Sequence, residues 1–202
     1  MQTDADARTL AFYDTNASAY SERKPRREDI EALGYFMAQI PSESKICDLG
    51  CGNGWASAEF VKNGHCVIAI DGSSGLALEA KRKYGLNVEV KHFGELELNR
   101  ELDGLWACWS LHHVSATDFP KILQHVSTFI RPGGLFFFSI KGGTTEDRDK
   151  NDRLYARYEW SELSNLIEDN VDGMILSHVS WTVCERDGSE SLRHQVFVKI
   201  AT

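Results

Sequence analysis

The chain has 202 residues, of which 42% are hydrophobic and 26% are charged, and its formal net charge at pH 7 is −8. This length and composition are ordinary for a globular protein of one domain. Sequence-independent binding to nucleic acid requires a basic surface, so the acidic balance disfavours it and we expect no nucleic-acid partner. The dense basic run is RKPRR at residues 23–27, which also suits a solvated helix start.

The cysteines and the N-terminal residues bear on the cellular compartment. The five cysteines form no Cys-x-x-Cys pair, and several lie in apolar runs, so we interpret them as reduced and mostly structural. The first residues, MQTDAD, lack the basic-then-apolar pattern of a signal peptide. The apolar runs are shorter than the ~20 residues that cross a bilayer. We expect a cytoplasmic protein without a membrane partner, present as a monomer or a homodimer.

Strand and helix signals alternate along most of the chain. Residues 1–40 are predicted to be helical, near 8–16 and 27–39. Strands are predicted at 45–49, 66–70, 86–90, 104–108 and 135–140, and helices at 55–62, from Ser73 or Ser74 to Tyr84, and from the cap Asp118 to Ile130. Such alternation predicts a parallel sheet that is covered on both faces.

The pattern changes after residue 140. Residues 141–151 are polar and charged and are predicted to form a long mobile loop. A helix is predicted at 161–168, followed by strands at 174–183 and 192–200 that form a hairpin and add an antiparallel strand to the sheet. Since no repeat or linker marks a boundary, we expect a single domain over 1–202, with a helical lid at 1–40 and an α/β core at 41–202.

A glycine-rich segment lies between the first predicted strand and the next helix. It spans residues 48–54, DLGCGNG. Glycines allow a sharp turn and a close approach of the backbone to a ligand, and ligands bind beyond the carboxyl ends of such strands. Asp71 ends the next strand, where a carboxylate can accept hydrogen bonds from two ribose hydroxyls, each worth roughly 1.5–3 kcal/mol. The pattern therefore predicts a nucleoside-containing cofactor.

Other glycine-loop sites fit this segment less well. A nicotinamide site needs a third small residue, but that position holds Trp55 when counted from Gly50 and Ser57 when counted from Gly52. No Lys-Ser/Thr pair follows the glycines, which excludes a P-loop. A tight turn without any ligand remains the purely structural interpretation.

Segment 48–54 resembles motif I of the class I S-adenosylmethionine-dependent methyltransferases. Asp71 matches the ribose-binding acid of that family, residues 104–114 resemble its fourth-strand segment, and IRPGG at 130–134 resembles the turn before its fifth strand. The resemblance covers roughly residues 10–200. It implies an α/β, Rossmann-like fold with a doubly wound, seven-stranded, mostly parallel sheet of order 3-2-1-4-5-7-6, strand 7 antiparallel, and S-adenosyl-L-methionine as the cofactor.

The resemblance also implies roles for individual residues at the cofactor site. The implied cofactor contacts are Tyr13, Tyr20, Arg23, Asp48, Gly50, Cys51, Gly52, Asp71, Gly72, Ser73, Phe93, Gly94 and Trp109. Arg23 would meet the methionine carboxylate, and Asp48 would reach the cofactor amino group directly or through water. Phe93 would stack on adenine, although the acid that the family often places there is absent from HFGE at 92–95.

Three residues after the fourth strand are candidate catalytic residues. Trp109 and Ser110 would lie beside the reactive methyl group, and His113 would act as a general base. A packing role for Trp109, and a structural role for His112 and His113 in the turn, are the alternatives. Positioning alone can supply on the order of 7–11 kcal/mol, so methyl transfer needs no strong side-chain signature. No residues have metal-ligand spacing, and we expect no metal.

The segment 141–158 is rich in arginine and tyrosine and resembles a run in small bacterial methyltransferases of the tellurite-resistance type. Arg148, Arg153 and Tyr155 are the candidate substrate-binding residues, because guanidinium groups suit a carboxylate or phosphate on a small acceptor. Ion pairs with the acids at 146–149 are the alternative. The Asn/Asp-Pro-Pro-Tyr signature of nucleobase methyltransferases is absent, which favours a small-molecule acceptor and leaves a peptide open.

Three functions remain compatible with the sequence. The favoured one is S-adenosylmethionine-dependent methyl transfer by in-line displacement. The second is a regulatory protein that binds S-adenosylmethionine without catalysis. The third, an NAD-type Rossmann oxidoreductase, is disfavoured by Trp55 and by the Pro-Gly-Gly before the fifth strand.

Overall fold

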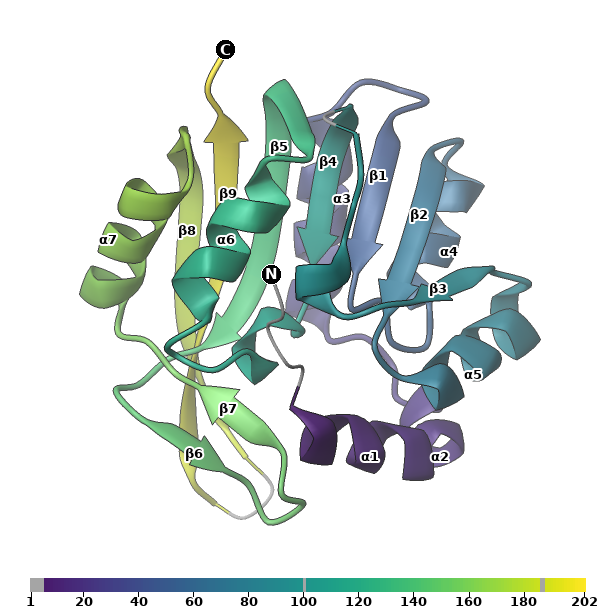
Figure 1. Ribbon diagram of the computed structural model, residues 1–202, viewed down its shortest axis with the longest axis vertical. Helices are drawn as coiled ribbons and strands as arrows, with labels where there is room; N and C mark the ends of the chain where they lie inside the picture. The colour runs from purple at the N-terminus through teal and green to yellow at the C-terminus, as the bar shows by residue number, and fades with distance from the viewer. Residues whose placement is uncertain (1–5, 100, 186–187) are drawn as a thin grey trace.

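Seven strands form one mixed sheet in the computed structural model, which describes residues 6–99, 101–185 and 188–202 (Figure 1). The strands are β1 (Lys45–Leu49), β2 (Cys66–Asp71), β3 (Val88–Val90), β4 (Leu102–Ala107), β5 (Ile130–Lys141), β8 (Gly173–Cys184) and β9 (Glu190–Ile200). Their order is β3-β2-β1-β4-β5-β9-β8. Strands β1 to β5 are parallel, and β9 is antiparallel to both of its neighbours. The predicted order 3-2-1-4-5-7-6, with an antiparallel seventh strand, is therefore confirmed.

Helices cover both faces of this sheet (Figure 1). They are α1 (Ala7–Thr15), α2 (Ala17–Ser21), α3 (Arg27–Ala38), α4 (Trp55–Lys62), α5 (Ser74–Tyr84), α6 (Phe119–Ser127) and α7 (Trp160–Asn170), with 3₁₀ turns η1 (Phe93–Glu95) and η2 (Leu111–His113). Helix α6 buries residues at helical spacing, among them Phe119, Ile122 and Val126. Among the described residues, no helix is both long and apolar enough to cross a bilayer.

The central strands separate two layers of core side chains. On β5, Phe136 and Phe138 pack with the helices α6 and α7, whereas Phe137 packs with α3 and α4 on the opposite face. The ring of Trp106, on β4, stacks on Phe137 with the ring centroids 3.9 Å apart. Because both faces of these strands are buried, apolar residues follow one another along the strands and do not alternate with polar ones.

Two sequence predictions about local structure are wrong. Helix α6 ends at Ser127, and Ile130 begins β5 by pairing with Leu102, so the helix does not continue to residue 130. The predicted long mobile loop at 141–151 contains a short strand, β6 (Glu146–Arg148), which pairs antiparallel with β7 (Leu154–Ala156). The sequence of β6 is fully charged, and that of β7 is too short to show a period of two.

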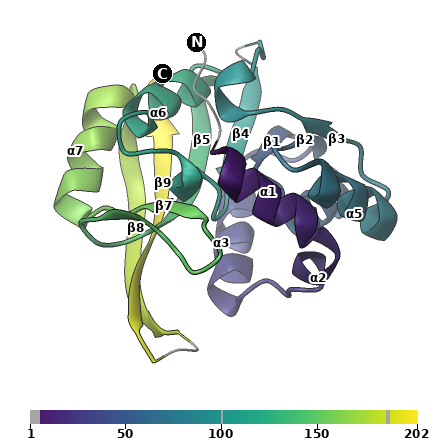
Figure 2. The same ribbon diagram turned by 60° about the horizontal axis from the view of Figure 1, so that its bottom comes forward.

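The carboxyl ends of the parallel strands meet at one edge of the sheet, and other elements lie across this edge. Helices α1 and α2 and the β6–β7 hairpin lie below the strand ends in Figure 1 and come forward in Figure 2. Helix α3 instead packs on the face of the sheet, where Phe36 contacts Trp106 with ring centroids 5.4 Å apart. Within residues 6–40, the elements that lie over the edge are therefore α1 and α2.

Candidate functional site

A cavity of about 1390 Å³ opens at the carboxyl ends of the central strands. Its wall includes residues from α1 and α2, the loop after β1, the turn after β4, the end of β5 and the β6–β7 hairpin. Pockets for one drug-sized ligand measure about 300–1,000 Å³. The cavity therefore has room for a cofactor and for a second small molecule.

Two glycines of the loop after β1 have different physical reasons to be glycine. Gly50 has φ +75°, and a Cβ atom there would lie 2.3 Å from the Cβ of Ser110. Gly52 has φ +57°, and a Cβ atom there would meet nothing within 4 Å, although Gly52 lines the cavity. Gly50 thus lets the loop pack against the turn after β4, and Gly52 leaves a space into which a ligand fits.

The carboxylate of Asp71, at the end of β2, is held in a fixed orientation at the cavity wall. The backbone N–H of Gly52 donates to Oδ2 at 2.7 Å, and that of Ser73 donates to Oδ1 at 2.8 Å. Burial raises the pKa of Asp71 to about 6. Each oxygen keeps a lone pair for a further donor, so the carboxylate is suited to two neighbouring hydroxyl groups.

Three of the predicted cofactor contacts do not line the cavity. Asp48 is buried and accepts a hydrogen bond from the Ser57 hydroxyl at 2.6 Å, so it joins β1 to α4 and does not reach a ligand directly. The Ser73 hydroxyl caps α5 and donates to Asp14 at 2.7 Å. Gly94 lies within η1. The sequence pattern could not tell which way each of these three residues faces.

The predicted residues of the N-terminal segment lie at the cavity. Tyr13, Tyr20 and Arg23 line it. The rings of Tyr13 and Tyr20 meet edge to face with centroids 4.9 Å apart, and the Arg23 guanidinium lies 4.2 Å from the Tyr20 ring centroid. Arg23 has no ion-pair partner within the part of the chain that the structure describes, so its charge is available to an anionic group of a ligand.

The turn after β4 places an aromatic ring in the cavity in an unusual backbone conformation. Trp109 has φ +57°, which is a genuine outlier for a bulky residue. Its backbone N–H donates to the Ser139 hydroxyl and its indole Nε1–H donates to Asp29, both at 2.8 Å. The Ser110 hydroxyl donates to the Leu49 carbonyl at 2.7 Å. The polar atoms of both side chains are thus bound within the protein, and the Trp109 ring is left to contact a ligand.

His113 is neutral, and its basic nitrogen is covered. Nδ1 lies 2.6 Å from the Leu154 carbonyl, which can only accept, so Nδ1 carries the proton. Nε2 therefore accepts from the Tyr13 hydroxyl, 2.8 Å away. Burial lowers the pKa of His113 to about 4. The imidazole thus joins α1 to the β6–β7 hairpin, and Tyr13 must move before Nε2 can take a proton from a ligand.

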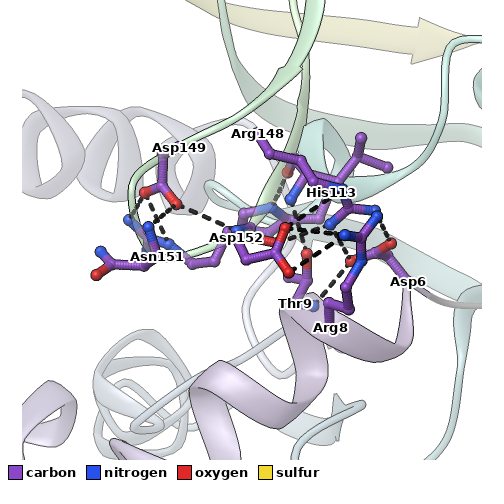
Figure 3. Close-up of polar contacts among 10 residues, drawn as sticks. Asp6, Arg8, Thr9, His113, Arg148, Asp149, Asn151 and Asp152 are labelled. Carbon is purple, nitrogen blue, oxygen red and sulfur yellow. Dashed lines mark hydrogen bonds and ion pairs between the residues drawn. The ribbon is translucent and has the colours of Figure 1, made fainter.

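Arg148, a predicted substrate-binding residue, does not line the cavity. Figure 3 shows its guanidinium turned toward the N-terminus of α1, where it makes two hydrogen bonds to the carboxylate of Asp6 and one to the carbonyl of Asp152. This ion pair holds the pKa of Asp6 well below its usual range. Nearby, the Leu154 N–H donates to the Thr9 hydroxyl at 2.9 Å. Arg148 thus ties the hairpin to α1.

Arg153 and Tyr155 do line the cavity. Arg153 donates to Asp149 at 2.6 Å, which is the ion pair considered as the alternative, and to the Tyr13 hydroxyl at 3.2 Å. The Tyr155 ring packs against His113 with centroids 4.7 Å apart.

Sequence reasoning missed several charged residues of the cavity. They are Asp29, Lys141, Arg157, Glu185 and Arg193. Burial raises the pKa of Asp29, which the sequence shows only as an acid in the first turn of a helix. Lys141 and Arg193 are opposite each other in the β5–β9 pairing, and the sequence does not reveal that register.

Comparison with known proteins gives a family match over the central part of the chain. Residues 46–134 match the family model of the methyltransferase domain. The chain is 28% identical over 102 residues to the malonyl-[acyl-carrier protein] O-methyltransferase of Erwinia pyrifoliae. This alignment covers 47% of this chain and 36% of that protein. The chain is 26% identical over 176 residues to the ubiquinone biosynthesis O-methyltransferase of Histophilus somni, covering 70% and 73%. The chain thus spans about a third of the first of these relatives.

The fold has counterparts among solved structures. The 1,6-didemethyltoxoflavin-N1-methyltransferase of Burkholderia thailandensis, solved with 1,6-didemethyltoxoflavin and S-adenosylhomocysteine, matches with a TM-score of 0.69 and 21% identity over 99% of this chain and 92% of that one. At this identity the likeness shows the fold. The domain match, the sheet order and the glycine loop with Asp71 agree with one another. Residues 46–134 therefore match a methyltransferase domain, and the whole chain has the fold of solved S-adenosylmethionine-dependent methyltransferases.

Proposed function

We propose that the protein transfers the methyl group of S-adenosylmethionine to a small-molecule acceptor. The observation that carries this proposal is the Asp71 carboxylate, held by two backbone amides beside the open space at Gly52. When bound, the cofactor supplies a methyl group whose bond to sulfur breaks as the bond to the acceptor atom forms, leaving S-adenosylhomocysteine. An acceptor O–H or N–H gives up its proton to water or to a base.

The cofactor half of the cavity follows from this assignment. Asp71 accepts hydrogen bonds from the two ribose hydroxyls, and Gly50, Cys51 and Gly52 present their backbone to the methionine portion. Arg23, which has no ion-pair partner among the described residues, neutralises the methionine carboxylate. Gly72 and Phe93 lie on the adenine side. The support is that all of these residues line one cavity at the expected edge of the sheet.

The residues after β4 form the acceptor half. Trp109 contacts the reacting groups, and the two hydrogen bonds at 2.8 Å hold its strained backbone, a feature that concentrates at functional sites. Ser110 acts as a positioning residue because it holds the Leu49 carbonyl next to Gly50. His113 is a positioning residue for Tyr13, because its basic nitrogen accepts a hydrogen bond from the Tyr13 hydroxyl.

A small acceptor suits the enclosure of the site. Helices α1 and α2 lie over the strand ends, so an acceptor must fit within the cavity beside the cofactor. The net charge of −8 disfavours a polyanionic acceptor such as nucleic acid. The five free cysteines support a reducing compartment, and we propose the cytoplasm.

Calorimetry with wild-type and variant protein tests the cofactor assignment. We expect S-adenosylmethionine and S-adenosylhomocysteine to bind at micromolar concentrations, and Asp71→Ala to weaken both at least tenfold. Glu59→Gln, on α4 and paired with Lys62 outside the cavity, is the matched control and should bind like the wild type. Binding of NADH in place of these two compounds would overturn the proposal.

A turnover assay separates the enzyme from a regulatory protein. The protein is incubated with methyl-labelled S-adenosylmethionine and a panel of small hydroxylated, amino and carboxylic compounds, and label transfer is followed. Transfer that Asp71→Ala abolishes supports the methyltransferase. Cofactor binding without transfer to any compound would favour the non-catalytic alternative.

A further inference from the structure

Positively charged side chains gather in the acceptor half of the cavity. Lys141 ends β5 and is directly opposite Arg193 on β9, so their side chains leave the same face of the sheet. Both line the cavity, together with Arg153 and Arg157 near the β6–β7 hairpin. Three different parts of the chain thus bring cations to one wall.

Three carboxylates near this wall are each paired with an arginine, whereas Asp29 accepts a hydrogen bond from the Trp109 indole N–H. Asp149 accepts from Arg153 at 2.6 Å, Asp147 pairs with Arg157, and Glu185 accepts from Arg193 at 2.6 Å. Lys141 has no carboxylate or hydrogen-bond partner among residues 6–99, 101–185 and 188–202, and its Nζ lies 3.8 Å from the Tyr155 ring centroid. Of these four cations, Lys141 is therefore the one that has no paired acid among the described residues.

The pKa of Lys141 agrees with the absence of a paired acid. Burial lowers the pKa of Lys141 to about 8, and repulsion from Arg157, Arg153 and Arg193 acts in the same direction, whereas Glu185 opposes it. An anion in the cavity would reverse this effect, because it would offset the repulsion among the cations. The wall is thus arranged for a negative charge.

Arg193 supplies an independent observation. Arg193 is 1% exposed, and its Nε and Nη1 have no hydrogen-bond partner within the described part of the chain, although Nη2 donates to Glu185. The guanidinium lies 5.3 Å from the centroid of the Trp109 ring, which lines the cavity. Buried donors normally have partners, so unpartnered N–H groups at a cavity wall indicate a ligand acceptor.

We propose that an anionic group of the methyl acceptor, a carboxylate or a phosphate, binds to Lys141 and Arg193, with the body of the acceptor against Trp109. This proposal rests on the proposed function, since it assigns the acceptor half of the same cavity. Trp109 links the two halves, because it follows β4 beside the glycine loop and its ring faces Arg193. The acceptor is therefore a small organic anion that spans the distance from this wall to the transferred methyl group.

The test uses protein saturated with S-adenosylhomocysteine and three probes: benzoate, phenyl phosphate and uncharged benzyl alcohol. We expect at least one of the two anions to bind, and benzyl alcohol to bind at least tenfold more weakly. Lys141→Gln should weaken anion binding at least tenfold, whereas Lys62→Gln should change it less than twofold. Lys62 is exposed on α4, so both variants lose one positive charge and only Lys141→Gln alters the cavity.

The outcomes separate this proposal from the proposed function. Tighter binding of benzoate assigns a carboxylate, and tighter binding of phenyl phosphate assigns a phosphate. Binding of S-adenosylhomocysteine without either anion, or equal anion binding in Lys141→Gln, would overturn the anion subsite alone. Failure to bind S-adenosylhomocysteine would overturn the proposed function and this proposal with it.

Wild-type protein gives a second measurement if Lys141→Gln does not fold. Benzoate stays ionised from pH 7 to pH 9.5, whereas Lys141 loses its proton near pH 8 in the field of Arg153, Arg157, Arg193 and Glu185. We expect the benzoate affinity to fall several-fold between these pH values. An affinity that is constant over this range would contradict a role for Lys141.

Discussion

The guanidinium of Arg148 on β6 binds the carboxylate of Asp6, the residue that caps α1, although 142 positions separate them in the chain. The Asp6 carboxylate also accepts from the Thr9 N–H at 2.8 Å, so one side chain both starts the helix and joins it to the hairpin. Helix α1 carries Tyr13 into the cavity wall. The ion pair therefore holds α1, which forms part of the cavity wall, in place.

Arg148→Met should weaken the attachment of α1 to the β6–β7 hairpin. We expect a stability loss of about 1 kcal/mol, between the values for exposed and buried ion pairs, and faster amide exchange over residues 7–21. The dissociation rate of S-adenosylhomocysteine should rise several-fold. Arg8→Met removes a more exposed pair with Asp152 in the same cluster and should have little effect. Unchanged exchange in Arg148→Met would show that other contacts hold α1.

The contribution of the Asp6–Arg148 ion pair to stability should depend on pH in the acid range. The folded pKa of Asp6 lies below the unfolded value, so its contribution to stability is present above pH 3.8 and is lost as the pH falls below that value. The difference in the free energy of unfolding between wild-type and Arg148→Met protein should therefore be greatest at pH 6 and should shrink progressively between pH 4 and pH 2. A difference that increased on acidification would contradict this assignment.

Substitutions at Gly50 and Gly52 should separate stability from cofactor binding. Gly50→Ala puts a Cβ atom 2.3 Å from Ser110 Cβ at a positive φ, so we expect a stability loss of about 2 kcal/mol or more. Gly52→Ala also has a positive φ but no close neighbour, so its loss should be about 1 kcal/mol. Its methyl group occupies the ligand space, and the affinity for S-adenosylhomocysteine should fall at least tenfold.

Chemical unfolding and calorimetry on the same two variants check this prediction. Asp71→Ala provides a reference for loss of binding through a different contact. Equal losses of stability in Gly50→Ala and Gly52→Ala, with wild-type affinity in the latter, would refute the assignment of the open space to the cofactor.

The sequence predicted the elements that bury apolar side chains, because periodicity and glycine positions are local properties. The helix at Trp55–Lys62 and the strand at Lys45–Leu49 have the predicted bounds, and Ser73 caps α5 as one of the two predicted candidates. The β6–β7 hairpin was missed because both strands are short and β6 is fully charged. Their pairing depends on contacts with α1 that are distant in the sequence.

The direction of individual side chains at the site depends on tertiary contacts. The glycine loop and Asp71 were predicted because their spacing follows the strand ends. Arg148 and Arg153 lie in the same arginine-rich segment, and the sequence does not distinguish their roles. In the structure, Arg148 faces Asp6, and of the two only Arg153 lines the cavity. Lys141 and Arg193 come together through strand pairing between residues 52 positions apart, which no local pattern encodes.

Asp48 should make the free energy of unfolding depend on pH near neutrality. Burial raises the pKa of Asp48 to about 7, well above the unfolded value, and repulsion from Asp71 adds to this effect. A raised folded pKa stabilises the protein fully below pH 3.8, and that contribution is lost as the pH rises through 7. We expect the free energy of unfolding to fall by on the order of 2 kcal/mol between pH 5.5 and pH 8.5.

Asp48→Asn is the matching variant. Asparagine keeps an acceptor for the Ser57 hydroxyl and carries no charge, so the fall in stability between these pH values should shrink. Urea unfolding of both proteins at the two pH values measures the difference. The same fall in Asp48→Asn as in the wild type would show that another group is responsible.

Asp71 should make cofactor binding depend on pH in the opposite direction. Its pKa is raised to about 6 in the protein without ligand, and the protonated carboxyl accepts fewer hydrogen bonds than the carboxylate. The affinity for S-adenosylhomocysteine should therefore rise about tenfold between pH 5 and pH 7 and stay constant up to pH 8.

In Asp71→Asn this rise should disappear, because the amide has no charge to lose. Since Asp48 lies behind the loop and does not line the cavity, Asp48→Asn should keep most of the rise. If Asp71→Asn retained the full pH dependence, the ribose hydroxyls would be bound by another residue.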